Sequence, residues 1–514
     1  MLRLFVIFIT LCISACATKH NDNKEKKEIQ EIKSNYNTDV PESILTLSRY
    51  DTRLGSLEFK DGIPTKETSK KVYDNLDFLR GVETFLNGIP AASLHSIRKG
   101  MLDLGLVECN HVAIADDFLF SNPLLLTGNT STVYANLFFD LKKDGPIVIE
   151  VPKGTGPGTV NDAFFRFVID MGAPGPDKGK GGKYLILPPD FKGKAPEGYF
   201  VAQSTSYINW LILRGLPVNG KPDFASHLFR TKLKVYPLKD KDNPPNMKFL
   251  DISKKAFNTI HANNYHFYEE LHEAIDYEPI SFLDPELRGL FASVGIEKSK
   301  PFKPDNRMKK ILEEAVAVGN ATARAIVFDT REKGAVLFKG THWEKGFIGG
   351  DYRWLKNKGL GGRYLDARTK FFYVATVNTP AMVWKLLEVG SQYGLISKDV
   401  NGEHFDGDKT YKLTLPANPP VKNFWSVVVY DPQTRSELQT SQLYPSVTSR
   451  NKKLKYNKDG SIDLYFGPTA PKGQEENWVQ TIPGKSWFAI LRLYGPLKEW
   501  YDDRWIPGEF IEVK

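Results

Sequence analysis

The sequence contains very little cysteine and no long apolar segment beyond its first residues. Its 514 residues include 3 cysteines, and after residue 15 no stretch is apolar enough to cross a bilayer as a helix. Two catalytic motifs are also missing, the Gly-x-Ser-x-Gly elbow of serine hydrolases and the His-Glu-x-x-His motif of zinc enzymes. No reaction can therefore be assigned from these motifs.

The charge of the chain is only mildly basic. Lysine and arginine number 69 and aspartate and glutamate 61, which gives a formal net charge of +8. This balance permits contact with anionic lipid or polysaccharide surfaces and does not indicate nucleic-acid binding. The 41% hydrophobic and 12% aromatic content is that of an ordinary globular protein, and the length predicts two or more domains.

The N-terminal segment resembles the signal of a bacterial lipoprotein. A basic start precedes a short apolar run, residues 4–13, and small residues then lead to Cys16. The resemblance implies that residues 1–15 are a signal peptide and that a lipid is attached to Cys16. Residues 16–40 would then be a polar tether, which cannot bury a core. Because Ala17 follows the cysteine, we expect a cell-envelope protein, lipid-anchored to the outer membrane and facing the periplasm in a Gram-negative organism.

Cys109 is the only cysteine left in such a mature chain, so an intramolecular disulfide is excluded. A small buried apolar residue is the simplest interpretation of this position. His111 would share a face with Cys109 in a strand, which leaves a reactive thiol pair as the alternative.

Turn residues divide the chain into short segments that favour β structure. Its 41 glycines and 32 prolines separate many short apolar runs. Strands are predicted at residues 133–140, 147–151, 184–187, 198–202, 424–430, 461–466 and 487–494. Helices are predicted at residues 68–102, with an interruption at 88–90, and at 307–325 and 381–392.

We therefore expect a mainly β protein with a helical connection, of the α+β class. The predicted divisions are an N-terminal β-rich domain at residues 41–250, a helical connecting region at 251–395 and a C-terminal β domain at 396–514.

Two glycine-rich loops are candidates for anion binding. The loop at residues 153–159 follows a strand, and its backbone N–H groups could hold phosphate. Its glycine spacing does not match a dinucleotide motif and a proline removes one donor, so a structural turn is the favoured interpretation. The loop at residues 172–182 contains lysines and is predicted to form an exposed rim.

Potential metal ligands are densest between residues 261 and 273. They are His261, His266, Glu269, Glu270, His272 and Glu273. Bundle di-metal sites need a second such motif on another helix, and no second copy occurs in the sequence. We expect a solvated amphipathic helix here, with no metal and no cofactor.

The candidate ligand site lies in the C-terminal part, where polar and aromatic residues are most concentrated. Arg492 lies in an otherwise apolar strand and needs an acceptor, for which Asp431 is a candidate. Arg450 could hold an anion with its guanidinium fork, and Trp478 could supply a stacking wall. The predicted site comprises Tyr430, Asp431, Tyr444, Arg450, Asn477, Trp478, Arg492 and Tyr494. The alternative is a structural network that fixes strand packing.

Motifs in both halves of the chain carry a family resemblance. In the first half they are residues 73–77, 85–87, 175–184 and 187–189, and in the second half 424–426, 430–431, 459–461, 477–478 and 491–494. These motifs resemble a bacterial family with two domains of unknown function, numbered 1254 and 1214. The resemblance implies a β-sandwich-like N-terminal domain, a helical connection and a jelly-roll-like C-terminal domain, and it brings no agreed activity.

Two functions follow as hypotheses. The first is a cell-envelope lipoprotein that binds a polar ligand, such as a glycan or a small anionic metabolite. The alternative is an envelope hydrolase, acting on glycosides or esters through a carboxylate pair or an unrecognised metal site. The expected partners are the membrane, through the lipid anchor, and the ligand, but no nucleic acid. A homo-oligomer is also compatible with the sequence, because the edges of a sandwich need covering.

Overall fold

The computed structural model describes residues 38–513, and these fall into two compact units. The first unit ends at Lys71, and the second begins at Val72. Cys16, the predicted signal peptide and most of the predicted tether lie outside the described residues. The first unit contains a three-stranded antiparallel sheet of β1 (Arg49–Thr52), β2 (Gly55–Lys60) and β3 (Ile63–Pro64).

Helix α1 (Lys66–Asp103) continues through the segment where the sequence predicted an interruption. Gly88 is a point of close helix packing, because a Cβ there would lie 2.6 Å from Leu271 Cδ2 of α4 (His266–Tyr277). The following turn of α1 is fully buried at Ile89, Ala91 and Ala92. Burial of this face offsets the roughly 3 kcal/mol that a proline costs inside a helix.

The N-terminal β region contains two sheets that share one buried cluster. A six-stranded sheet has the order β13-β4-β5-β11-β7-β8, and a four-stranded sheet has the order β10-β9-β6-β12. The strands are β4 (His111–Ile114), β5 (Val133–Asp140), β6 (Ile147–Val151), β7 (Gly158–Asp162), β8 (Phe167–Met171), β9 (Gly182–Leu187), β10 (Phe200–Gln203), β11 (Ile208–Gly215), β12 (Lys234–Pro237) and β13 (Lys248–Asp251). Two short helices, α2 (Leu141–Asp144) and α3 (Asp223–Lys232), accompany these strands.

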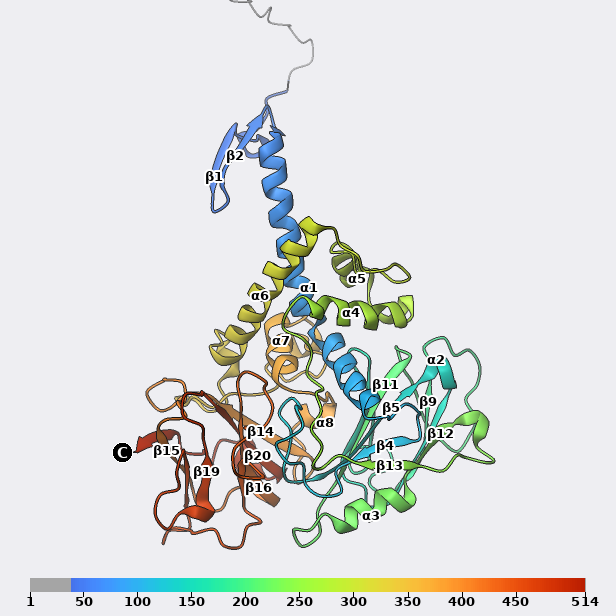
Figure 1. Cartoon of the computed structure of the whole chain (residues 1–514), viewed down its shortest axis with the longest axis vertical. Helices are drawn as coiled ribbons and strands as arrows, with labels where there is room; N and C mark the ends of the chain where they lie inside the picture. Colours follow the sequence, from blue (N-terminus) through green and yellow to red (C-terminus); the bar gives the residue numbers. More distant parts are fainter. Residues whose placement is uncertain (1–37, 514) are drawn as a thin grey trace, which may run out of the picture. The chain divides into compact units, whose positions relative to one another are not determined.

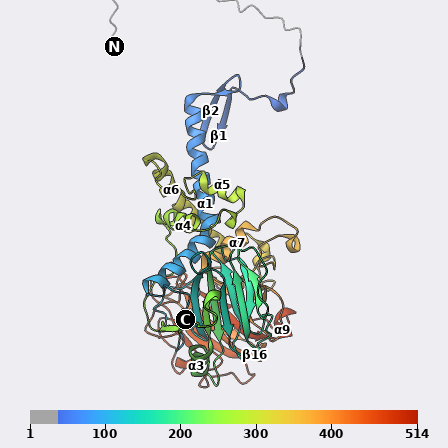
Figure 2. The same cartoon turned by 90° about the vertical axis from the view of Figure 1, so that its right-hand side faces the viewer.

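The C-terminal β region repeats this arrangement with two four-stranded sheets. Their orders are β14-β20-β16-β17 and β19-β18-β15-β21. The elements are β14 (Ser391–Ile396), β15 (Thr410–Leu415), β16 (Val421–Tyr430), β17 (Ser446–Thr448), β18 (Ile462–Gly467), β19 (Trp478–Gln480), β20 (Phe488–Pro496), α9 (Lys498–Tyr501) and β21 (Phe510–Val513). Figure 1 shows the two β regions next to each other, and in Figure 2 the green strands lie in front of the orange and red ones.

The alternation of side chains along β20 determines which of them point into the C-terminal core and which point to the opposite face of the sheet. Ala489, Leu491 and Leu493 belong to the cluster shared by the two C-terminal sheets. Since successive side chains of a strand point to opposite faces, Arg492 and Tyr494 lie on the other face. That face is turned toward the N-terminal β region, as the contacts of these two residues show.

The segment between the β regions is largely helical. Besides α4 it contains α5 (Pro285–Ala292), α6 (Asn306–Phe328), α7 (Leu365–Val374) and α8 (Pro380–Val383). The predicted helix at residues 381–392 was wrong, because α8 ends at Val383 and β14 begins at Ser391. Antiparallel pairing of β14 with β20 outweighs the local helix propensity of this segment.

The fold class is mixed α+β, as the sequence predicted. Every strand predicted from the sequence is present, with shifts of one to three residues at some ends. The part of the chain that the structure describes contains five sheets, none of them closed into a barrel. None of its helices has both the length and the apolar character needed to span a bilayer.

Candidate functional site

A cavity of about 190 Å³ lies between the two β regions of the large unit. Strands β5, β7, β8 and β11 line one side and β14 and β20 the other, with contributions from α1 and α7. Most of the wall is apolar, and its largest members include Ile97, Met101, Trp210, Phe371, Leu395 and Ile490. Two arginines, Arg214 on β11 and Arg492 on β20, also line it.

Within the described part of the chain, all acceptors of Arg492 are neutral oxygens. Its Nη2 donates to the carbonyls of Thr127 (2.7 Å) and Gly128 (3.1 Å) and to the hydroxyl of Tyr430 (2.7 Å). The Nε atom is buried and has no acceptor. Asp431, the acceptor proposed from the sequence, instead forms an ion pair with Lys485. That expectation was wrong because Asp431 follows Tyr430 at the end of β16, beyond the face that carries Arg492.

Arg214 approaches the same region from the N-terminal sheet. Its Nη1 donates to Ser391 Oγ (2.9 Å) and its Nη2 to the hydroxyl of Tyr134 (3.3 Å). The guanidinium carbon lies 5.7 Å from the ring centre of Tyr494, which brings the two arginines to one aromatic cluster. Tyr393 completes this cluster, with its ring centre 5.4 Å from the guanidinium carbon of Arg492.

The buried Arg492 and the partly buried Arg214 make the cavity electrostatically unusual. Burial lowers the pKa of Arg214, but the oxygens of Tyr134, Tyr393 and Tyr494 raise it above its ordinary value overall. Burial raises the pKa of Tyr134, but Arg214 and Arg492 together lower it below the ordinary value. Among the described residues no carboxylate forms an ion pair with either arginine, so phenol oxygens take the place of an anion.

Asn129 holds this cluster together. Its Nδ2 donates to the hydroxyls of Tyr494 (2.7 Å) and Tyr134 (3.1 Å) and to Thr132 Oγ1 (3.1 Å). The side chain is 1% exposed and lies in the loop before β5. One amide thus connects tyrosines from both β regions.

Glu437 is a buried carboxyl group next to this cluster. A Cβ on Gly128 would lie 2.9 Å from its Oε1, and neither carboxyl oxygen has a hydrogen bond within residues 38–513. Burial raises the pKa of Glu437 to about 8, although Arg492 acts in the opposite direction. At neutral pH it is therefore mostly protonated and does not neutralise Arg492.

Asp170 on β8 is the acidic member of the cavity wall. Both its carboxylate oxygens accept from Thr379 Oγ1, at 2.7 and 2.8 Å. Burial raises the pKa of Asp170 to about 6, against the hydrogen bonds that lower it. Its charge consequently changes within the physiological range.

The structure brings together only part of the site predicted from the sequence. Tyr430 accepts from Arg492 and Tyr494 accepts from Asn129, and Arg492 also donates to the carbonyls of Thr127 and Gly128, in the same loop as Asn129. Arg450 lies beside them, with its guanidinium carbon 4.1 Å from the ring centre of Phe424, but it is not part of the cavity wall.

The remaining predicted residues lie elsewhere. Tyr444 packs edge-on against Phe120 at 5.4 Å between ring centres. Asn477 donates to the carbonyls of Lys455 and Asp463, and Trp478 Nε1 donates to the carbonyl of Gly467 (2.9 Å). Asn477 and Trp478 thus brace β18 and β19, in the sheet that does not carry Arg492.

Sequence reasoning missed five residues of the site, four of them in the N-terminal β region and one on β14. The missed residues are Asn129, Tyr134, Asp170, Arg214 and Tyr393. Arg214 carries the same signal that singled out Arg492, an arginine near the end of an apolar strand. The other four have no such signal, because Asn129 lies in a loop and Tyr134, Asp170 and Tyr393 lie in strands whose sequence pattern resembles that of purely structural strands.

The reactive thiol, the loop at residues 172–182 and the metal ligands considered from the sequence show no features of a functional site in the described residues. Burial raises the pKa of Cys109 to about 12, so its sulfur is a thiol at neutral pH. In the loop at residues 172–182, Asp177 is buried and accepts from Gly181 N and the Tyr184 hydroxyl. Within the described residues no group of three or more histidine, cysteine, aspartate or glutamate side chains has a metal-binding arrangement.

Two parts of the chain match protein families of unknown function. Residues 109–237 match the family described as DUF1254, and residues 390–498 the family described as DUF1214. The chain thus contains one DUF1254 domain and one DUF1214 domain, both described as being of unknown function. The resemblance seen in the sequence is confirmed at this level. Arg214 lies in the first domain and Arg492 in the second.

Among solved structures, the chain is similar to the VPA0106 protein from Vibrio parahaemolyticus. The two chains are 17% identical with a TM-score of 0.52, over 85% of this chain and 100% of that chain, which shows a shared fold. An uncharacterized protein from Burkholderia cenocepacia is 10% identical with a TM-score of 0.38, over 86% of this chain and 96% of that chain. No curated protein matches the chain.

Proposed function

We propose that the protein binds a small amphipathic anion, of the carboxylate class, in the cavity between its two β regions. The observation that carries this proposal is the pair Arg214 and Arg492. Both line the cavity wall without a carboxylate partner in the described chain; Arg492 is buried, Arg214 is partly buried, and Arg492 Nε lacks an acceptor there. An unpaired buried cation is costly, and an anionic ligand would compensate it with charge-assisted hydrogen bonds.

The rest of the wall supports an amphipathic ligand. Side chains such as Trp210, Phe371 and Ile490 would contact an apolar body while the anionic group faces the arginines. The volume of about 190 Å³ favours a small metabolite over a polymeric glycan. Of the two ligand types expected from the sequence, the cavity therefore favours the anionic metabolite.

The proposal is tested by calorimetric titration of the protein with benzoate and hexanoate, and separately with the primary amides of these two acids. We expect the carboxylates to bind at least about tenfold more tightly, because charge-assisted hydrogen bonds to the arginines contribute about 1.5–3 kcal/mol. The variant Arg492→Gln should lose this preference. Arg435→Gln is the matched control, because Arg435 is 1% exposed and does not line the cavity. Equal binding of acid and amide would contradict the proposal.

A hydrolase is the second candidate function, and Asp170 favours it. A carboxyl group with a pKa of about 6 in a cavity wall can accept or donate a proton near neutral pH. Turnover in an ester and glycoside screen that is lost in Asp170→Asn would support this alternative. An unchanged rate in that variant would exclude Asp170 as the acid or base.

The envelope location is part of the same proposal. Its support is the apolar run before Cys16 in the sequence, and the lipid anchor would place the cavity in the periplasm. The finer fold assignments, a sandwich at residues 41–250 and a jelly roll at 396–514, are likewise proposals.

A further inference from the structure

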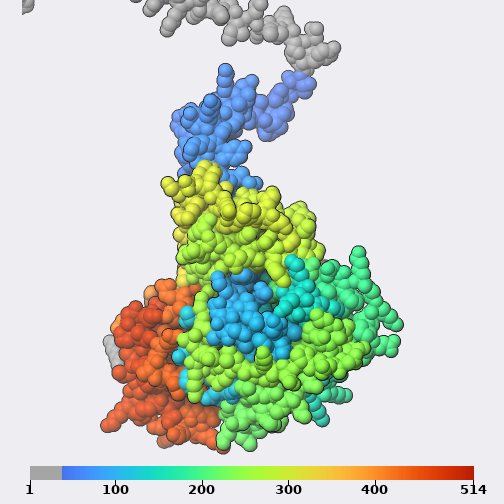
Figure 3. Space-filling model, turned by 45° about the vertical axis from the view of Figure 1, so that its right-hand side comes forward, coloured from blue at the N-terminus to red at the C-terminus, as the bar shows by residue number. Residues whose placement is uncertain are grey.

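A second cationic site lies outside the cavity between the β regions. It is an open groove of about 940 Å³, bordered by residues of α2, the β7–β8 turn and the segment that includes α5. Four basic side chains line it, and they are Lys142, Arg166, Arg288 and Lys298. Asp284 is the only acidic residue in the wall, so the lining carries a formal charge of +3, from four cations and one anion. In Figure 3 the cyan residues near α2 adjoin the yellow-green helical segment.

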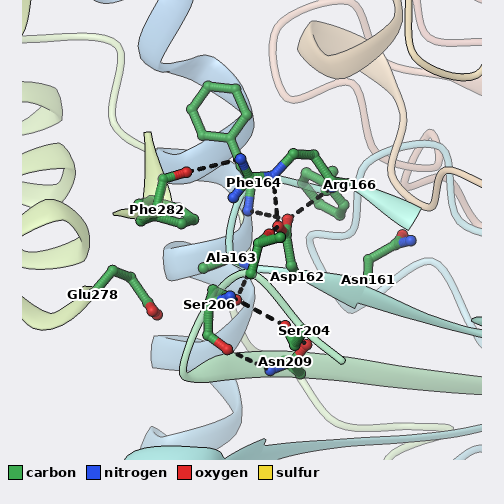
Figure 4. A network of polar contacts seen from close by, with 12 residues as sticks. Asn161, Asp162, Ala163, Phe164, Arg166, Ser204, Ser206, Asn209, Glu278 and Phe282 are labelled. Carbon is green, nitrogen blue, oxygen red and sulfur yellow. Dashed lines mark hydrogen bonds and ion pairs between the residues drawn. The ribbon is translucent and has the colours of Figure 1, made fainter. Parts of the chain in front are cut away.

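Arg166 is fixed in place at the base of this groove. Its Nε donates to Asp162 Oδ2 (2.6 Å), and its Nη1 donates to the carbonyl of Phe282 (2.7 Å). Figure 4 shows this arginine between the two acceptors. Asp162 in turn accepts the backbone N–H groups of Phe164 and Arg166, both at 2.8 Å. The β7–β8 turn therefore positions the guanidinium before any ligand arrives, and its Nη2 is buried with no acceptor.

Two further arginines around the groove have unsatisfied nitrogens. Arg288 in the wall has a buried Nε without an acceptor. Arg368 lies behind the wall, 7% exposed, and its guanidinium carbon is 5.9 Å from the Phe164 ring centre, the same distance as that of Arg166. Its Nη2 donates to Asn87 Oδ1 (2.6 Å), but its Nε has no acceptor. Two guanidinium groups of the groove wall, those of Arg166 and Arg288, thus each keep a buried N–H without an acceptor among residues 38–513.

The neighbouring acidic groups cancel only part of this charge. Asp162 neutralises Arg166 only. Burial raises the pKa of Glu278 to about 8, so this carboxyl is mostly protonated at neutral pH. Asp284 accepts the neutral backbone N–H of Leu287 at the start of α5 and keeps its charge, which is already included in the charge of the lining. The groove consequently presents an excess of positive charge to solvent.

We propose that this groove binds a phosphate group through Lys142, Arg166, Arg288 and Lys298. Guanidinium forks match the oxygens of a phosphate, and the two lysines add point charges that a dianion can use. The site is independent of the cavity that holds Arg492. Free phosphate and the headgroup of an anionic phospholipid share this chemistry, and their binding can be separated by experiment.

Calorimetric titration of the full-length protein with inorganic phosphate at low ionic strength tests the site. We expect phosphate to bind at one saturable site. The affinity for phosphate should be at least about tenfold lower in the double variant Lys142→Gln/Arg288→Gln. Lys143→Gln is the matched control, because Lys143 neighbours Lys142 but faces Glu108, 2.6 Å away, and does not line the groove. The control should bind phosphate within twofold of the wild type, and a melting curve of each variant verifies folding.

Competition with monomeric short-chain lipids distinguishes a phospholipid headgroup from a free phosphate as the ligand. Displacement of phosphate by dihexanoyl phosphatidylglycerol, but not by dihexanoyl phosphatidylcholine, supports a lipid headgroup. Binding of inorganic phosphate alone supports a free phosphate or phosphate ester. Absence of phosphate binding in the wild type, equal binding by the folded double variant, or loss of binding only in Arg492→Gln would overturn the proposal.

Discussion

The guanidinium of Arg492 and the hydroxyl of Tyr430 are 2.7 Å apart on one face of neighbouring strands, β20 and β16. The phenol oxygen accepts from Arg492 Nη2, and its own O–H donates to the carbonyl of Gly128 (2.8 Å). This contact joins the C-terminal sheet to the loop that precedes β5. The buried guanidinium of Arg492 is also hydrogen-bonded here to a neutral phenol, where a carboxylate would be the usual partner of a buried cation.

Replacing Tyr430 with phenylalanine should therefore destabilise the protein. The change removes one acceptor from Arg492 and one donor from Gly128 in a fully buried setting, so we expect a loss of about 1–3 kcal/mol. Urea unfolding of the wild type and the variant measures this loss of free energy of unfolding. Tyr456→Phe is the control, since Tyr456 is 51% exposed. Equal effects of the two substitutions would contradict the role of the Arg492 contact.

Binding of an anion in the cavity should depend on pH through Asp170. Its pKa of about 6 means that the carboxyl is neutral below this pH and negative above it. A negative wall repels an anionic ligand, so affinity for benzoate should fall as pH rises from 5 to 7. The variant Asp170→Asn should keep the high affinity across this range. A wild-type affinity that rises with pH would be inconsistent with this assignment.

Glu437 should make folding stability decrease with increasing pH. Its pKa is about 8 in the folded state, above the ordinary value of 4.5. A raised pKa means that this contribution is fully present below 4.5 and is lost as pH rises toward 8. The loss is at most about 1.4 kcal/mol per pH unit. Denaturation of Glu437→Gln at pH 5 and pH 8 should show a flatter dependence, and an unchanged slope would rule out Glu437 as the cause.

The crossing of α1 and α4 should not tolerate a side chain at Gly88. A Cβ there would lie 2.6 Å from Leu271 Cδ2, so Gly88→Ala should cost about 1–3 kcal/mol through overpacking. Gly289 in α5 has nothing within 4 Å of such a Cβ. Gly289→Ala should therefore stabilise the protein by about 0.5–1 kcal/mol. Thermal unfolding of both variants tests the pair, and destabilisation by both would refute the packing argument.

The lipid anchor can be tested by cell fractionation. Substituting Cys16 with alanine removes the sulfur that would carry the lipid, so the protein should leave the membrane fraction or stay at its unprocessed size. Ser14→Ala is a control that leaves the cysteine in place. A Cys16→Ala protein of processed size that still sediments with membranes would show that the anchor prediction is wrong.

The sequence by itself determined the local structure and one side of the candidate site. Short apolar runs between turn residues predicted strands such as β5 and β6 with their bounds, and an apolar stripe at helical spacing predicted α6. Arg492 was found because an arginine inside an apolar strand conflicts with that pattern. These signals are local, since each is encoded within a few residues of the chain.

Only the tertiary structure decided what Arg492 faces. Its acceptors, Thr127 and Gly128, precede it by more than 360 positions, and Asn129 reaches Tyr494 across a similar separation. No periodicity encodes such a meeting, which arises when two sheets from different parts of the chain pack against each other. For the same reason the sequence proposed Asp431 as the acceptor of Arg492, whereas in the fold Asp431 pairs with Lys485, and neither Arg214 nor Arg492 has a carboxylate partner within residues 38–513.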